Sequence, residues 1–435
     1  MQPLPLLCAT ILALGNICLT LTHAASTLIS MTDAELSDVS GQALMSMSYI
    51  APTDSVSNSD YNGNIGFYRL ALDAQMEINT NIRKLQLGCG GVNGAGACDI
   101  DIDYLSLSGG TVDSTNAERA ASSAVITNPF LEFAIKNPDS ASTREIQGFR
   151  LSAQSLSGLL TFGLENGDKE SGINSLSGYL VTKPTTGTVT TNPYYGITQD
   201  GTNTAITGQA TVLGQGATLP FSSTSYNLNL GAGTGTLSMA QQVITGKRIT
   251  MANLNATAKV NGLSITGTLD ATASLLGAPL PISGNVTGTV NNLDVNVAIN
   301  QSLGYFHAAQ LDGSAGYLSV QGANILWPEA ASVAQTGWWL ELTNPIDIGQ
   351  ITPTGNVDIA LSTITDTLGQ VSSYLNTPGN AVDCGFLGLN CVALGNLPVG
   401  TVDLTGKTPA SMTLTNIVLQ KQSFSPNCYG SLKFC

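Results

Sequence analysis

The sequence predicts a mainly β protein, with long antiparallel sheets in an elongated, sandwich-like body. Three observations lead to this prediction. Apolar and polar residues alternate with a period of two over several long segments, which is typical of strands with one buried face. Glycine recurs between these segments, often in Thr-Gly or Asn-Gly pairs that mark turns. Charged residues make up only 10% of the chain, against roughly a quarter in ordinary soluble proteins, so strong helix formers are few.

Three segments carry the strand pattern most clearly. Residues 99–104 alternate polar and apolar, and the phase slips by one at Leu105, which predicts a β-bulge. Residues 254–260 and 293–300 alternate without interruption. The apolar residues expected to share a buried face are Leu254, Ala256, Ala258 and Val260 in the first of these segments, and Leu293, Val295, Val297 and Ile299 in the second.

Two helices are expected beside the sheets. Thr32 and Glu35 form a capping-box pattern, and Gly41 ends a short N-terminal helix that would cover one end of the β-structure. A later amphipathic helix begins near Leu361 and ends at residues 376–379. Its apolar residues, spaced three and four apart, are Leu361, Ile364, Leu368, Val371 and Leu375. We expect this apolar side to dock on the protein's own sheet.

The first residues predict an export signal. The run from Leu4 to Leu21 contains no charged residue, and Ala24 and Ala25 follow it, so we assign residues 1–24 to a signal peptide. No Lys or Arg precedes the run, which leaves a retained membrane anchor as an alternative. Lipoprotein processing at Cys18 is disfavoured by the residues before it. No other stretch is long and apolar enough to span a bilayer. The remaining chain is divided into two β-rich regions, 25–200 and 201–435.

The charge balance limits the class of partner. The chain carries a formal net charge of −14. Such a chain repels nucleic acid and anionic lipid headgroups, so DNA and RNA are excluded as expected partners.

Six cysteines remain after the predicted signal, and they fall into three local couples. An even number in an exported chain predicts disulfides, and six cysteines allow 15 connectivities. Local pairing is favoured because each couple spans few residues and includes turn formers. A thiolate zinc site is the alternative, but eight and six intervening residues do not match a zinc knuckle. The expected pairs are Cys89 with Cys98, Cys384 with Cys391, and Cys428 with Cys435.

Three carboxylates form the candidate metal site. Asp99, Asp101 and Asp103 would lie on one face of a strand, with neighbouring side chains roughly 7 Å apart. Their mutual repulsion would favour a bound cation, and calcium prefers oxygen ligands. The alternative is a solvated strand face. Calcium is the one cofactor considered, and otherwise none is expected.

Three tryptophans form the candidate binding surface. Trp327, Trp338 and Trp339 are all the tryptophans in the chain. If exposed, they could stack on sugar rings or anchor a partner, and core packing is the alternative. Trp338 and Trp339 are adjacent and must point to opposite faces of a strand.

Catalytic residues are not apparent. Signal removal takes away His23 and leaves His307 as the one histidine, so a histidine metal cluster cannot form and any catalytic triad would need His307. A nucleophile elbow, a P-loop and a His-Glu-x-x-His motif are all missing from the sequence.

Three segments resemble a family of Gram-negative envelope proteins that includes components of a Fil-type pilus system. They are residues 33–43 (DAELSDVSGQA), 85–109 (LQLGCGGVNGAGACDIDIDYLSLSG) and 128–151 (NPFLEFAIKNPDSASTREIQGFRL). The resemblance implies a pilus-associated or surface protein. Its partners would be other pilus or envelope proteins, or further copies of itself. It carries over no catalytic residue.

The function expected from the sequence is that of an exported cell-surface or pilus-associated protein with a structural or adhesive role, and not an enzyme. Its location would be the periplasm, the outer membrane surface or an extracellular filament. An extracellular module that binds glycans through the tryptophans is the alternative, and a secreted hydrolase that uses acidic residues is a third hypothesis.

Overall fold

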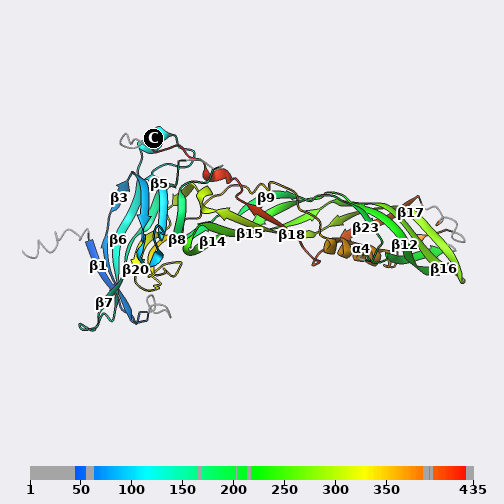
Figure 1. The fold of residues 1–435 in the computed structure, drawn as a ribbon, viewed down its shortest axis with the longest axis horizontal. Coiled ribbons are helices and arrows are strands. Elements are labelled where there is room, and N and C mark those ends of the chain that lie inside the picture. Colours follow the sequence, from blue (N-terminus) through cyan, green and yellow to red (C-terminus); the bar gives the residue numbers. More distant parts are fainter. Residues whose placement is uncertain are drawn as a thin grey trace, which may run out of the picture. The chain divides into compact units, whose positions relative to one another are not determined.

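A computed structural model describes residues 45–54, 63–164, 169–201, 203–212, 217–385, 391 and 395–427. The chain divides into two compact units, residues 1–46 and residues 47–435. Of the first unit only Met45 and Ser46 are described, so the predicted signal and the helix expected from Thr32 to Gly41 lie outside the described residues. Strands dominate the rest (Figure 1), and the predicted mainly β class is confirmed.

Twelve strands form the largest sheet. They are β1 (Met45–Ile50), β2 (Ile65–Leu72), β3 (Gln75–Ile78), β4 (Thr80–Leu87), β5 (Ile100–Ser108), β6 (Ala124–Lys136), β7 (Glu145–Thr161), β8 (Ile173–Thr182), β14 (Gln242–Ile249), β19 (Ala308–Asp312), β20 (Gly316–Gln321) and β21 (Gly337–Leu342). The order is β1-β2-β6-β7-β20-β21-β8-β5-β4, while β3, β14 and β19 pair with β6, β8 and β7.

Two further sheets contain most of the second half of the chain. The seven-stranded sheet contains β10 (Tyr194–Thr198), β11 (Thr207–Val212), β12 (Ala217–Leu230), β16 (Leu263–Leu275), β17 (Ala278–Asn291), β22 (Val382–Asp383) and β23 (Asn396–Asp403). The five-stranded sheet contains β9 (Thr185–Thr190), β13 (Thr234–Met239), β15 (Met251–Asn261), β18 (Leu293–Ser302) and β24 (Ala410–Thr415). Most pairs are antiparallel, but β22, β23 and β24 join their sheets in parallel, so the sheets are mixed.

One long hairpin passes through both of these sheets. β15 continues into β16 through Gly262, and β17 continues into β18 through Asn292 (Figure 1). The buried positions are even-numbered up to Val260 and odd-numbered from Leu263. A shift of one residue turns all following side chains to the opposite face. We call the break at Gly262 and Asn292 the kink. On one side of the kink the hairpin pairs in the five-stranded sheet, and on the other side it pairs in the seven-stranded sheet.

Asparagine side chains hold this kink. Gly262 and Asn292 have φ values of 75° and 60°. The Gly262 amide donates to Asn291 Oδ1, and the Asn292 amide donates to Asn261 Oδ1, both over 2.9 Å. Asn292 Nδ2 also donates to Asp403 Oδ1 at 3.0 Å, at the end of β23. The amide side chains thus replace the ladder hydrogen bonds that the kink interrupts.

The predicted strand patterns are confirmed in β15 and β18, where every apolar residue named above is buried. The bulge predicted at Leu105 is wrong. The interruption lies at Tyr104, whose φ is 48°, and the register of β5 with β4 is the same on both sides of it. At this point β5 changes its other partner from β8 to β7.

The later helix is confirmed as α4 (Leu361–Leu375), which contacts β11 and β23. Ile364, Leu368, Val371 and Leu375 are buried, whereas Leu361 at its first position is exposed. A second helix of one turn, α3 (Asn116–Ala120), was not predicted, and its capping box of Thr115 and Glu118 is visible in the sequence. In the described part of the chain, no helix has the length and apolarity required to cross a membrane.

The three sheets and α4 share one large apolar core, and a smaller core forms around Trp327 and Trp339. The boundary proposed at residue 200 lies between β10 and β11, which belong to the same sheet. It does not separate the sheets because β14, β19, β20 and β21 return to the sheet that the N-terminal strands form.

Candidate functional site

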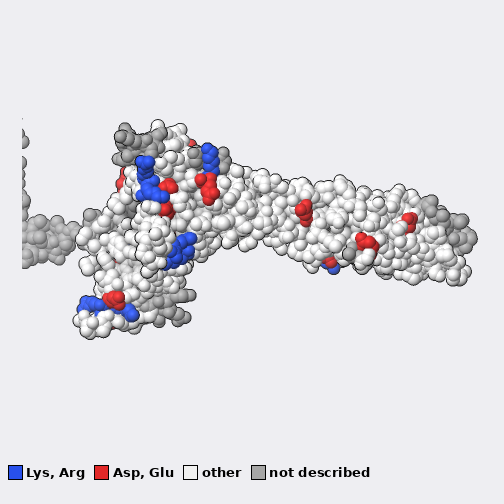
Figure 2. All heavy atoms as spheres, viewed as in Figure 1, with Lys and Arg blue, Asp and Glu red and all other residues white. Residues whose placement is uncertain are grey.

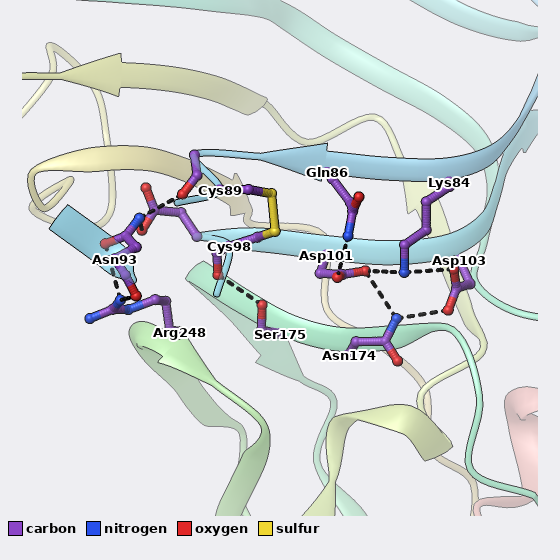
Figure 3. Close-up of a disulfide and its surroundings, with 12 residues drawn as sticks. Lys84, Gln86, Cys89, Asn93, Cys98, Asp101, Asp103, Asn174, Ser175 and Arg248 are labelled. Carbon is purple, nitrogen blue, oxygen red and sulfur yellow. Dashed lines mark hydrogen bonds and ion pairs between the residues drawn. A yellow bond between two sulfur atoms is a disulfide. The ribbon is translucent and has the colours of Figure 1, made fainter. Parts of the chain in front are cut away.

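The first predicted disulfide is confirmed and closes the loop between β4 and β5. Cys89 bonds to Cys98, nine residues later (Figure 3). Within the loop, the Gly90 amide donates to the Ala97 carbonyl at 3.1 Å. Asn93 Nδ2 donates to the Gly88 carbonyl at 2.6 Å. The disulfide therefore fixes the shape of a glycine-rich loop rather than joining distant parts of the fold.

Asp99 connects this loop to the centre of the sheet. It is 2% exposed, and its carboxylate accepts hydrogen bonds from Asn93 Nδ2 at 3.1 Å and from the Trp338 amide at 3.0 Å. A Cβ at Gly88 or Gly337 would lie within 2.4 Å of Asp99 Oδ2. These two glycines are thus required by the close approach of the carboxylate.

Asp101 and Asp103 lie together, as predicted, and the cation between them is a lysine. Lys84 Nζ lies 2.6 Å from Asp101 Oδ1 and 2.9 Å from Asp103 Oδ1 (Figure 3). Asn174 Nδ2 donates to both carboxylates, at 3.1 and 2.8 Å, and Gln86 Nε2 donates to Asp101 at 2.9 Å. The ammonium group relieves the repulsion for which calcium was considered.

The pKa values of this cluster shift in the directions that the pairing requires. Burial alone would raise the pKa of Asp101, but hydrogen bonds from Lys84, Gln86 and Asn174 outweigh burial and lower it. Burial alone would lower the pKa of Lys84, but its contacts with Asp101 and Asp103 raise it. Among the residues with assigned positions, no group of three or more His, Cys, Asp or Glu side chains could hold a metal ion. Asp99, the third residue of the calcium hypothesis, has separate partners.

Two of the three tryptophans are part of the core. Trp327 and Trp339 are each 1% exposed and pack with Phe67 and Tyr317. Trp338 points to the other face of β21, where it is partly buried against the large core. The glycan platform inferred for Trp327 and Trp339 is therefore corrected: fully buried rings cannot stack on a ligand, and the core-packing alternative describes them.

His307 is enclosed by backbone groups. It is fully buried. Its Nδ1 lies 3.3 Å from the Phe162 carbonyl, and its Nε2 lies 2.9 Å from the Lys169 carbonyl. Both ring nitrogens therefore face main-chain oxygen atoms, which is the environment of a structural histidine.

A cavity of about 370 Å³, lined by both charged and apolar side chains, lies on one face of β2, β6, β7 and β20, and sequence reasoning missed it. Arg69 and Arg150 line the cavity, and Glu132 is fully buried between them. Arg69 Nε donates to Glu132 Oε1 at 2.9 Å, and Arg150 Nη2 donates to Glu132 Oε2. Arg150 also lies 5.2 Å from the ring centre of Tyr317. The guanidinium group is thus enclosed by one carboxylate and several aromatic rings.

A second carboxylate balances the charge of this cavity. Glu341 is 2% exposed and accepts hydrogen bonds from the Ala331 amide at 2.8 Å and the Ser332 amide at 3.0 Å. The Tyr317 hydroxyl donates to it at 3.2 Å. Burial, followed by the nearby charge of Glu341, raises the pKa of Tyr317. Two buried acids therefore match two arginines, and the loop from residue 328 to 336 is held against the sheet.

Arg119 forms another buried anchor that the sequence analysis did not single out. Its Nε donates to Ser108 Oγ at 2.9 Å, and its Nη2 donates to Ser106 Oγ at 3.0 Å. A third bond runs to the carbonyl of Ser425. Burial lowers the pKa of Arg119 to about 10. A buried arginine among hydroxyl groups thus ties the segment at Ser425 to β5. The signal in the sequence that could have identified Arg119 is the low charge content of the chain, 10%, in which each arginine is a candidate for a specific role.

The second predicted disulfide, Cys384 with Cys391, is also confirmed, and both cysteines are buried. The third pair, Cys428 with Cys435, lies outside the described residues. No family model matches the chain, and neither the curated proteins nor the solved structures contain a match.

Proposed function

We propose that this chain is an exported cell-surface or pilus-associated protein with a structural or adhesive role. The observation that carries the proposal is the kinked hairpin of residues 251–302. Along β15 its exposed positions hold Met251, Asn253, Asn255, Thr257, Lys259 and Asn261. Figure 2 shows how few charged side chains lie on the visible surface. A long backbone ladder whose exterior consists mostly of amide and hydroxyl side chains, with few charges, is suited to an extracellular scaffold.

The polar groups that could serve catalysis are used for structure. His307 faces two carbonyl oxygens, and Glu132 pairs with two arginines. Asp99 accepts hydrogen bonds from the Asn93 side chain and the Trp338 main-chain amide. Catalytic acids and bases need access to a substrate. Because the side chains of His307, Asp99 and Glu132 are occupied by structural contacts, they support a non-catalytic role. The two disulfides support export, because disulfides persist in oxidising compartments.

The decisive experiment is immunogold electron microscopy on intact producing cells, combined with mechanical shearing. We expect gold label along surface filaments or on the outer surface, and enrichment of the chain in the sheared fraction. A periplasmic protein probed in the same fractions controls for lysis. A strain that lacks the gene controls for antibody specificity.

The opposite result is equally clear. If the chain co-fractionates with the periplasmic control and no label reaches the surface of intact cells, the structural role at the surface is rejected. If label covers the cell body but not filaments, the filament-subunit form is rejected and the adhesive form is retained.

A further inference from the structure

The cavity beside Arg69 and Arg150 has the size and lining of a small-molecule site. Its volume of about 370 Å³ lies within the range of roughly 300–1,000 Å³ that ligand pockets occupy. Such pockets combine an apolar lining with a few polar groups that orient the ligand. Here Phe130 and Pro328 belong to the apolar lining, whereas arginine, glutamate, amide and hydroxyl side chains supply the polar groups.

Each of the two arginines has a guanidinium nitrogen that is not engaged. Both side chains line the cavity. In the described part of the chain, Arg69 Nη2 and Arg150 Nε are buried and make no hydrogen bond. The Arg150 side chain is only 3% exposed. Buried donors are normally paired, so unpaired guanidinium nitrogens beside a cavity favour a ligand that supplies an acceptor.

Glu329 is the carboxylate that lies nearest to the unpaired nitrogen of Arg69. Its Oε2 is 3.8 Å from Arg69 Nη2, which is too long for a hydrogen bond, and its side chain is 73% exposed. Its φ of 64° is uncommon for a residue other than glycine. The main chain is held on both sides of it, at Pro328 and at Ala331. The Glu329 side chain can therefore turn into solvent while the loop stays in place, and a ligand can take its position beside Arg69.

Charge selects a carboxylate over a more highly charged group. Glu132 and Glu341 balance Arg69 and Arg150, and Glu329 adds one negative charge. A phosphate with two charges would increase the negative charge near the buried acids. A carboxylate that takes the place of Glu329 leaves the net charge unchanged. Its two oxygen atoms match the planar fork of a guanidinium group.

The other polar groups of the cavity suit the hydroxyl groups of a sugar ring. Asn128 Nδ2 donates to Gln154 Oε1 at 2.6 Å, so Asn128 Oδ1 and Gln154 Nε2 can bond to a ligand. The hydroxyls of Ser152 and Thr343 donate to main-chain carbonyls at 3.1 and 2.6 Å, and their lone pairs can accept. Donors and acceptors thus lie together on one wall, and each sugar hydroxyl can act as either.

We propose that this cavity binds a hexuronate, a sugar whose ring carries one carboxylate. The carboxylate binds the Arg69 guanidinium group in place of Glu329, and the ring hydroxyls bond to Asn128 and Gln154. We call the cavity the sugar-acid site. The inference rests on the proposed adhesive role and deepens it by naming the class of ligand.

The test is a titration of the purified full chain, with disulfides intact, followed by saturation-transfer NMR on the ligand. The probe is sodium glucuronate. Glucose, which lacks the carboxylate, and acetate, which lacks the ring, are the comparison ligands. We expect a dissociation constant on the order of 1 mM for glucuronate, as is usual for one small ligand. Glucose and acetate should bind about tenfold more weakly or less, because each makes only part of the contacts.

Two variants with matched controls locate the binding. Glu329→Gln removes the competing carboxylate and should strengthen binding by about two- to fivefold. Asp294→Asn removes one negative charge from an exposed pair with Lys259 and should leave binding unchanged. Arg69→Gln should weaken binding by about tenfold or more, because it removes a charged hydrogen-bond donor. Lys259→Gln, which removes a cation elsewhere, should not.

Several results would overturn the inference. One is a native chain that binds no glucuronate at about 20 mM. Another is glucose or acetate that binds as tightly as glucuronate. A third is a Glu329→Gln variant that does not bind more tightly. If Arg69→Gln does not fold, Glu329→Gln decides alone, because it alters only an exposed side chain. Absent binding with positive surface labelling rejects the sugar-acid site alone, whereas binding without surface labelling rejects the proposed surface role.

Discussion

Removal of the buried carboxylate between Arg69 and Arg150 should cause a large loss of stability. Glu132 is fully buried, and both of its oxygen atoms accept a guanidinium hydrogen bond. In Glu132→Ala, Arg150 loses its carboxylate partner while its side chain is only 3% exposed. Arg69 is 18% exposed and keeps Glu329 at 3.8 Å, so most of the cost falls on Arg150. We expect a loss of about 3–5 kcal/mol in the free energy of unfolding, because an unpaired charge remains buried.

The assay is urea unfolding followed by tryptophan fluorescence. The Arg150 guanidinium lies 5.3 Å from the Trp327 ring centre, so the signal reports on this part of the sheet. The loss is read from the shift in midpoint at constant slope. Asp294→Ala is the control, because it removes an equally close but exposed pair with Lys259. That pair should contribute less than about 1 kcal/mol.

A loss below about 1 kcal/mol in Glu132→Ala would show that Arg150 finds another partner or water, and would refute the assignment of a costly buried charge. The double variant Glu132→Leu with Arg150→Met should recover much of the loss, because replacing a buried pair by apolar side chains is often neutral. Failure to recover would mean that the arginine also holds the loop at Pro328, to whose carbonyl it donates at 3.0 Å.

Three further outcomes are expected. The lowered pKa of Asp101 adds stability that is present above about pH 4 and is lost as the pH falls through the pKa of the folded state. The raised pKa of Lys84 adds stability that is present below about pH 10 and is lost as the pH rises through the pKa of the folded state. Lys84→Met should flatten both limbs of the urea midpoint plotted against pH, and unchanged limbs would contradict the pairing. Replacing Cys89 and Cys98 by serine should cost at most about 2–3 kcal/mol and speed amide exchange mainly within their loop, whereas loss of the whole fold would argue against a local role. Gly262→Ala should lower stability by about 1–2 kcal/mol by calorimetry, because its φ is 75° while the added Cβ meets nothing within 4 Å; a neutral effect would mean that the kink relaxes.

The sequence by itself determined the features that depend on neighbours along the chain. The period of two in β15 and β18 follows from which side chains face water, and it predicts their buried residues correctly. The spacing in α4 follows from helix geometry in the same way. Two disulfides were predictable because each closes a short loop. The capping box of α3, Thr115 with Glu118, is equally visible in the sequence.

Only the tertiary structure decided which residues meet across strands. Asp101 and Asp103 have Lys84 between them because β4 lies antiparallel to β5. The sequence of one strand does not determine which strand pairs with it or in which register. Glu132 joins two arginines from β2 and β7 for the same reason. Trp327 and Trp339 are buried in the smaller core because a loop folds back over one face of the sheet. Alternation fixes which residues share a face, whereas long-range pairing selects what lies opposite them, and that choice depends on packing over the whole fold.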